Sequence, residues 1–185
     1  MRFLEGTTNQ LTVVHIILIV LGAVLFLFFL FELVALSLLT KHNERIEKRN
    51  HRMNMLLMQK YDILLLIAKI FKKYKLEIPS EFEEELSPKM DESLKKLTLT
   101  ERLTVKAYLM KASQNLLYFA EANENVKNDT EFKILKKSLL EIDINHRKAI
   151  ALYNADALGF NYWIHFPLFR PISFIMKFKD KEIVS

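Results

Sequence analysis

The sequence predicts an all-α protein, in which an N-terminal transmembrane helix is followed by an antiparallel bundle of about four long helices. The first observation behind this prediction is a long, uninterrupted apolar run near the N-terminus. The second is a scarcity of turn-forming residues, since the 185 residues include only 3 Gly and 4 Pro, too few for a sandwich or barrel of many short strands. The third is the recurrence of apolar residues at steps of three and four, which is typical of amphipathic helices.

The apolar run from Leu11 to Phe31 is long enough to cross the roughly 30 Å hydrocarbon core of a bilayer as a helix. The apolar character resumes after Glu32 and ends at Lys41, so we assign the transmembrane helix to residues 11–39, after a short N-terminal segment at 1–10. A cleaved signal peptide is the main alternative, but its apolar region would extend over only about 7 to 15 residues. The length of the run therefore predicts a retained, single-pass anchor.

The basic residues near the ends of this helix predict its orientation. Arg2 alone precedes the helix, whereas a basic cluster follows it closely: Lys41, Arg45, Lys48, Arg49 and Arg52. Because an excess of Lys and Arg marks the cytoplasmic side, we expect the N-terminus outside and the remaining domain in the cytoplasm. His15 and Glu32 lie near opposite ends of the helix, where each can reach the membrane interface, and we expect both to be structural.

Residues 40–161 are predicted to form the helical bundle domain. No Gly or Pro occurs between Lys41 and Leu76, so we expect the membrane helix to continue directly into the first helix of the bundle. Its periodic apolar residues are Met53, Leu56, Leu57, Leu64, Ala68 and Phe71. The segment from Ile63 to Ile67 is apolar on every side, which predicts burial all round, inside the bundle or against another subunit.

Two further helices and a connection are predicted in the middle of the domain. Pro79 is expected to end the first helix, and the acidic residues between Ser80 and Leu86 suit a short helix, because carboxylates are favoured in a first turn. Thr98 and Glu101 form a capping box, and the helix that it opens has the apolar residues Leu103, Ala107, Met110, Leu117 and Ala120. The polar stretch from Asn123 to Asp129 is expected to be a connection.

The last long helix has the clearest period in the chain. Its apolar positions alternate steps of three and four, and they are Phe132, Leu135, Leu139, Ile142, His146, Ala149 and Tyr153. This pattern is typical of the seam of an antiparallel bundle or coiled coil. His146 lies on the seam, and we expect a core histidine with satisfied hydrogen bonds in preference to a ligand.

Residues 162–185 form a tail in which aromatic and basic residues alternate. Pro167 and Pro171 prevent one continuous helix. The tail either caps the bundle or lies at the membrane interface, where Trp, Tyr and Lys are favoured. Binding of single-stranded nucleic acid is a third reading, which we do not expect because no recognisable binding fold accompanies the pattern. The candidate interface residues are Tyr162, Trp163, Phe166, Phe169, Arg170 and Lys177.

The residues that most catalytic sites require are missing from the sequence. Cysteine is absent, which excludes disulfides, Cys-ligated metals and thiol nucleophiles. The 5 His do not form a metal-binding pair at helical spacing, and no Gly-rich phosphate loop or GxSxG elbow is present. We therefore predict a protein that is not an enzyme, with no cofactor, no metal, no small-molecule substrate and no nucleic acid.

An ordered set of short motifs runs through the chain. Tyr61-Asp62 lies in a QKYDIL segment, and a FxxLxxxLxxxE-like helix begins at Phe132 and reaches Asp143. Tyr153-Asn154, Phe160-Asn161 and Phe166-Pro167 follow in that order. In order and spacing these motifs resemble the LemA family of bacterial membrane proteins. Departures include Leu65-Leu66 where the family has Pro-Asn, and Ile150 where it has Arg, so the chain looks like a divergent member.

The resemblance implies architecture more than activity. It implies a membrane-anchored bundle of long helices in a bacterial cell membrane, with a structural role for the matching residues Tyr61, Asp62, Phe132, Asp143, Tyr153, Asn154, Asn161 and Pro167. In physical terms, Tyr153 and Asn154 suit a core phenol beside an amide that hydrogen-bonds the local backbone near a helix end.

Three functions are compatible with the sequence. The first is a membrane-anchored scaffold or protein-interaction protein, whose partners are membrane lipids and either another protein or a second copy. The second is a membrane-remodelling or lipid-surface-binding protein, and the third is a regulator or subunit of a membrane-associated enzyme.

Overall fold

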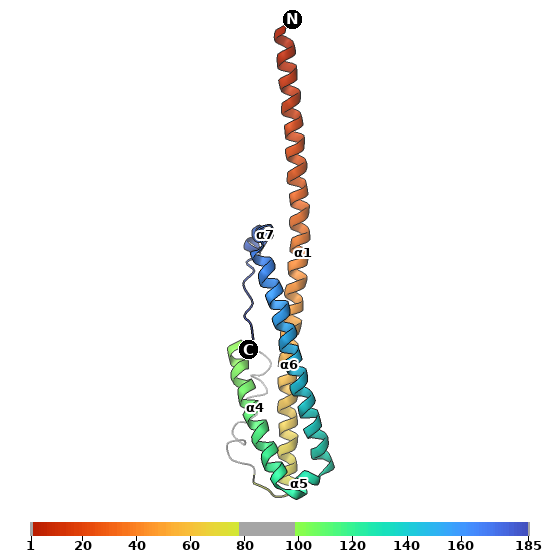
Figure 1. Ribbon diagram of the computed structural model, residues 1–185, viewed down its shortest axis with the longest axis vertical. Helices are drawn as coiled ribbons and strands as arrows, with labels where there is room; N and C mark the ends of the chain where they lie inside the picture. Colours follow the sequence, from red (N-terminus) through yellow and green to blue (C-terminus); the bar gives the residue numbers. More distant parts are fainter. Residues whose placement is uncertain (1, 78–98, 185) are drawn as a thin grey trace. The chain divides into compact units, whose positions relative to one another are not determined.

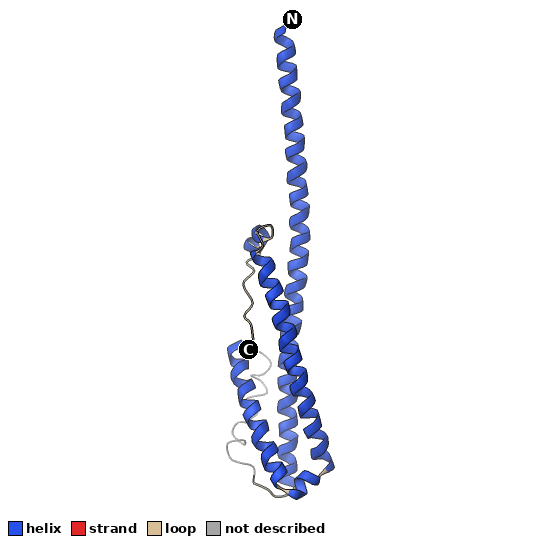
Figure 2. Cartoon of the chain, viewed as in Figure 1, coloured by secondary structure: helices blue, strands red, loops and turns tan. Residues whose placement is uncertain are grey.

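A computed structural model of the chain describes residues 2–77 and 99–184, and throughout these two ranges the regular structure is helical, without strands (Figure 2). The helices are α1 (Arg2–Lys73), α4 (Leu99–Ala122), α5 (Glu124–Asn128), α6 (Thr130–His165) and α7 (Arg170–Ile175) (Figure 1). The prediction of an all-α protein is confirmed. The helix expected at Ser80–Leu86 and the cap expected at Thr98 lie outside the described residues.

Helix α1 is continuous from Arg2 to Lys73, which confirms that the apolar segment runs straight into the first domain helix. Among the described residues it is the one helix long and apolar enough to cross a membrane, with a mean hydropathy of 3.1 over its best window, none of which is buried. The core helix of a soluble protein of the same composition would be mostly buried.

The end of α1 is set by backbone hydrogen bonds, before the chain reaches Pro79. The Leu76 N–H donates to the Phe71 carbonyl at 3.0 Å and the Lys75 N–H donates to the Lys72 carbonyl at 3.0 Å. Lys75 takes a φ of 55°, so the two hydrogen bonds form a Schellman motif with Lys75 at the left-handed position. This motif satisfies carbonyls that the end of the helix would otherwise leave unpaired.

The chain packs as two compact units, each formed by segments distant in sequence. The smaller unit is Met1–Glu44 with Leu158–Lys181, and the larger is Arg45–Ala157 with Glu182–Ser185.

Three long helical segments of the larger unit lie side by side, from α1, α4 and α6 (Figure 1). Ion pairs fix their directions. Lys73 meets Asp129 and Lys60 meets Asp143, so α6 runs antiparallel to α1. Lys136 of α6 pairs with Glu121 at the end of α4, so α6 is antiparallel to α4 as well. The core between the helices includes Leu57, Leu64, Ile67, Leu109, Leu116, Phe132 and Leu139.

Burial confirms the predicted inner faces of α1 and α6. All six periodic apolar residues of α1 are buried. On α6 the seam residues Phe132, Leu139, His146, Ala149 and Tyr153 are buried, with Leu135 and Ile142 half-buried between them. Helix periodicity alone was therefore sufficient to orient these two helices toward the core.

Three sequence expectations are corrected. Leu66 is 38% exposed, so the segment Ile63–Ile67 is not buried all round, because the described helices cover only part of the circumference of α1. On α4, Ala120 is buried as expected and Leu103 and Leu117 are half-buried, but Ala107 and Met110 are exposed. The buried residues of this helix are Arg102, Leu109, Ala112, Ser113, Leu116 and Ala120. The Asn123–Asp129 connection contains helix α5, because the Asn123 side chain accepts from the N–H groups of Asn125 and Val126 and caps a short turn.

In the smaller unit, the ring of Phe31 on α1 packs against Phe169 at a centroid distance of 5.5 Å. Helix α7 then ends in a second Schellman motif. The Phe178 N–H donates to the Ser173 carbonyl at 3.0 Å, the Lys177 N–H donates to the Phe174 carbonyl at 3.2 Å, and Lys177 has a φ of 54°. The motif turns the chain back, which lets the tail return along α6.

Candidate functional site

A cavity of about 490 Å³ lies within the larger unit, with lining residues from α1, α4 and α6. Its apolar lining consists of Leu56, Leu57, Met110, Leu117, Leu140 and Ile142, and its charged lining consists of Lys60, Lys106, Asp143 and Arg147. Small-molecule sites in proteins typically have this size and this combination of many apolar groups with a few polar ones.

Lys60 and Asp143 form an ion pair in the lining of the cavity. The Lys60 Nζ donates to the Asp143 Oδ1 at 2.7 Å, and Lys60 is only 5% exposed. A buried ammonium needs such a partner, because leaving it unpaired in a poorly hydrated site costs roughly several kcal/mol. Asp143 was predicted to be structural, and pairing with Lys60 is the contact that it makes.

His146 also lines the cavity, and it is 7% exposed. Its Nε2 has no hydrogen-bond partner among the described residues, so the expectation of a satisfied core histidine is wrong for this atom. Burial lowers the pKa of His146 to about 4, and the positive charges of Lys106, Lys60 and Arg102 act in the same direction, against the opposing effect of Asp143. The imidazole is therefore neutral at pH 7.

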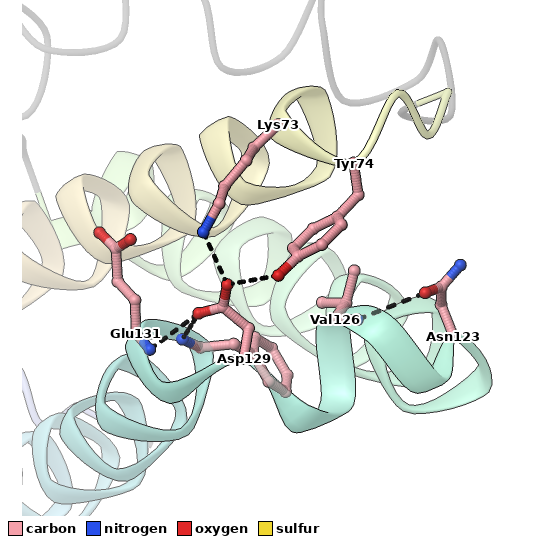
Figure 3. A network of polar contacts seen from close by, with 7 residues as sticks. Lys73, Tyr74, Asn123, Val126, Asp129 and Glu131 are labelled. Atoms are coloured by element: carbon pink, nitrogen blue, oxygen red, sulfur yellow. Dashed lines mark hydrogen bonds and ion pairs between the residues drawn. The ribbon is translucent and has the colours of Figure 1, made fainter.

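The Asp129 side chain joins the end of α1 to the start of α6 (Figure 3). Its Oδ1 accepts from the N–H groups of Glu131 at 2.8 Å and Phe132 at 3.1 Å, which makes Asp129 the N-cap of α6. Its Oδ2 accepts from the Lys73 Nζ at 2.9 Å and from the Tyr74 hydroxyl at 2.8 Å. Through these four hydrogen bonds, the carboxylate fastens the start of α6 to the end of α1. Asp129 itself directly follows α5.

The same contacts set the charge state of the Asp129 network. Hydrogen bonds from Lys73 and Tyr74 hold the pKa of Asp129 well below its ordinary value. In return, the hydrogen bonds to Asp129 raise the pKa of the Lys73 ammonium and of the Tyr74 phenol. The network is thus a charged carboxylate with matched donors, which is typical of a structural cap.

Two asparagines of α6 bind the returning tail by the same geometry, each within its own unit. In the larger unit, the Asn154 amide exchanges two hydrogen bonds with the backbone of Val184. In the smaller unit, the Asn161 Nδ2 donates to the Lys181 carbonyl at 2.9 Å and its Oδ1 accepts from the Lys181 N–H at 2.8 Å. The expectation of a bond to local backbone near a helix end is therefore wrong, because Asn154 lies inside α6 and its partner is far along the chain.

The predicted interface residues of the tail form an aromatic cluster in the smaller unit. Trp163 contacts the rings of Tyr162, Phe166 and Phe169 at centroid distances of 5.3, 5.8 and 5.3 Å. Phe169 is buried, Phe166 is half-buried, and Tyr162 and Trp163 are exposed. Arg170 is the first residue of α7 and Lys177 follows its C-cap Met176, and both are exposed.

The most exposed apolar side chains of this unit's tail were missing from the predicted interface. Phe174 is 85% exposed and Ile175 is 69% exposed, and Leu168 and Met176 are exposed as well. The sequence signal was present, since apolar residues follow Pro171 directly. The short helix α7 was not predicted from the sequence. Within this helix Ser173 is buried while neighbouring apolar residues are exposed.

The remaining predicted structural residues have different surroundings. Tyr61, Phe132 and Tyr153 are buried in the larger unit, whereas Asp62 and Pro167 are exposed. Within the described ranges, no group of three His, Asp or Glu side chains is arranged to hold a metal ion. Comparisons with protein-family models, with curated proteins and with solved structures find no match to this chain.

Proposed function

We propose that this protein is a membrane-anchored helical scaffold, which is held in the bilayer by α1 and contacts a protein partner through its domain. The observation that carries the proposal is the outer face of α6, which we define as Ile134, Leu140, Ile144, Ala151, Leu152 and Ala155. All six residues are exposed, and they are interspersed with the exposed charged side chains of Lys137, Glu141 and Lys148, whereas the outward face of a surface helix is ordinarily charged or polar throughout. Exposed apolar residues that share one face of a helix mark interaction surfaces.

The resemblance to the LemA family supports the same proposal. On this basis the chain is a divergent member with its N-terminus outside and its domain in the cytoplasm of a bacterial cell. The best window of α1 has no buried residues, which is what a helix surrounded by lipid would show. A reporter fused to the C-terminus tests the orientation, and an external signal would contradict it.

A photo-crosslinking amino acid at position 144 tests the partner surface in cells that express the full chain. We expect crosslinked protein bands with Ile144 replaced, and mass spectrometry of those bands tells a second copy from another protein. The matched control places the same amino acid at Gln59, which is exposed on α1. Equal crosslinking at both positions, or none at Ile144, would contradict a partner on the outer face of α6.

A second candidate function, contact with the lipid surface, is favoured by the exposed apolar residues of α7. Phe31 is the last residue of the apolar run Leu11–Phe31 and lies within the predicted span, and its ring contacts Phe169 of the aromatic cluster. Phe174 and Ile175 then offer apolar surface close to the basic side chain of Lys177. Apolar residues beside Lys and Arg suit the boundary between headgroups and acyl chains.

Quenching by lipids that carry a bromine near the headgroup tests this contact in the full chain. Trp163 is the single tryptophan, so its fluorescence reports on the aromatic cluster without labelling. A second measurement replaces Phe174 with Trp in a Trp163→Phe background. We expect quenching at both positions. Strong quenching at neither would contradict the lipid contact and leave the protein-scaffold proposal to the crosslinking result.

A further inference from the structure

The cavity of the larger unit contains features that the proposed scaffold function does not use. Its lining has three cationic side chains, Lys60, Lys106 and Arg147, against the single carboxylate of Asp143. A neutral His146 adds no charge to this balance. Among the charged lining residues cations outnumber carboxylates by three to one, a balance that favours an anionic guest.

The apolar part of the lining restricts that guest further. Leu56 and Leu57 lie on α1, Met110 and Leu117 on α4, and Leu140 and Ile142 on α6. A small inorganic anion would leave this apolar surface in contact with water. A guest with a hydrocarbon body would cover it and gain about 25 cal/mol for each Å² removed from water.

The unpartnered Nε2 of His146 is an independent observation at the same place. The atom is buried, and no described residue supplies the hydrogen bond that a buried polar atom ordinarily has. His146 is surrounded by charged groups from each neighbouring helix: Lys60 from α1, Lys106 and Arg102 from α4, and Asp143 from its own helix. A polar guest in the cavity would offer the ring a partner that the chain itself does not.

We propose that this cavity is a binding site for a small anionic amphiphile, with one carboxylate or phosphate head and an apolar body. The head lies among Lys106, Arg147 and His146, and the body lies along the leucines of α1 and α4. No small-molecule substrate is predicted from the sequence, and this proposal adds a small-molecule ligand. The proposal is independent of the scaffold function, because the outer face of α6 and the cavity lining share only Leu140.

The test uses the full chain in phosphatidylcholine nanodiscs, with ¹³C at the Cε1 of its histidines. Octanoate below its micelle concentration is the probe. We expect a saturable change in the His146 signal and no change in the signal of His51, which is exposed on α1. No saturable change at His146 would overturn the proposal.

Three further probes separate the contributions of head and body. Octyl phosphate tells a phosphate head from a carboxylate, and binding of either or both amphiphiles supports the site. Octanol carries the body without charge, and acetate carries the charge without a body. If octanol or acetate binds as tightly as octanoate, an anionic amphiphile is the wrong class and the proposal fails.

A pair of matched variants tests the location of the head. The double variant Lys106→Gln with Arg147→Gln removes two cations from the lining, and we expect it to weaken octanoate binding by at least about tenfold. The control, Lys111→Gln with Lys137→Gln, makes the same charge change at exposed positions of the same two helices. Equal weakening in both would overturn the site. If the double variant loses helical signal, the single change at exposed Arg147 replaces it.

Discussion

Asn154 holds the backbone of Val184 with both atoms of its side-chain amide. The Asn154 Nδ2 donates to the Val184 carbonyl at 2.7 Å, and the Asn154 Oδ1 accepts from the Val184 N–H at 2.9 Å. An adjacent strand would satisfy an extended residue by the same exchange of two bonds. The amide therefore replaces a strand partner for the end of the chain, and the Val184 side chain is buried in the larger unit as a result.

Replacing Asn154 with Leu should release the end of the chain and leave the bundle folded. Two neutral hydrogen bonds are lost, each with a net contribution of about 1 kcal/mol, so exchange of the Val184 amide hydrogen should accelerate by at least about tenfold. Hydrogen exchange read by NMR on the full chain measures this. Asn145→Leu, at an exposed position of the same helix, is the control, and unchanged exchange at Val184 would contradict the clamp.

Asp129→Asn should separate the charge of the Asp129 side chain from its role as a cap. Asparagine is as good an N-cap as aspartate, so α6 keeps its start, but the ion pair with Lys73 is lost. We expect a lower Tm for Asp129→Asn and a still lower one for Asp129→Ala, measured by circular dichroism. Asp62→Asn, which neutralises an exposed carboxylate of the same unit, should leave the Tm close to that of the parent.

The depressed pKa of Asp129 also predicts how stability depends on acid. Its folded pKa lies below the ordinary value of 3.8, so the unfolded state binds the proton first. The stabilisation is complete above about pH 3.8 and is lost as the pH falls below it. The Asp129→Asn variant should lack this part of the acid dependence. A variant that loses stability below pH 3.8 as steeply as the parent would contradict the assignment.

The sequence predicted the buried face of a helix correctly where the apolar residues of that helix form a single stripe. Met53, Leu64 and Phe71 on α1, and Phe132 and Tyr153 on α6, are buried as their spacing predicts, because a helix with one apolar stripe has one way to face a core. Leu66 differs because none of the described helices buries its side of α1. On α4 the apolar residues surround the helix, so its buried face depends on the neighbours, which the sequence does not give.

The candidate sites were harder to predict, because their members come from separate helices. Nothing in the local sequence of Lys60 indicates its pairing with Asp143, which depends on the antiparallel register of α1 and α6. The seam position of His146 was evident, but its missing partner was not, because a hydrogen bond depends on side chains far apart in sequence. The bonds from Asn154 and Asn161 to the tail depend in the same way on where the chain returns.

The exposed position of Leu66 gives a matched pair of core variants on α1. Leu64 is fully buried and Leu66 is 38% exposed, and the two side chains are chemically identical. We expect Leu64→Ala to destabilise the domain by about 3 kcal/mol, because it removes buried methyl groups and leaves a void. Leu66→Ala should cost less than about 1 kcal/mol. Urea unfolding of the full chain in nanodiscs measures both, and equal losses would contradict the described packing.

His146 should make the stability of the domain depend on pH. Its pKa is lowered from 6.5 to about 4 in the folded chain, so the unfolded state binds more protons between these values. The free energy of unfolding should therefore be constant above about pH 6.5 and fall as the pH drops toward 4. We expect a loss on the order of 2 kcal/mol, smaller than the whole shift would give because the cavity is partly open to water.

His146→Leu tests that dependence directly. The variant removes both the titrating group and the unpartnered Nε2, so its stability at pH 7 should equal or exceed that of the parent. Between pH 6.5 and 4 it should lose less stability than the parent by the His146 contribution, measured by urea unfolding at each pH. His51→Gln, at an exposed position, should keep the parent's profile. If His146→Leu keeps that profile as well, His146 is not the group that makes the folded state sensitive to mild acid.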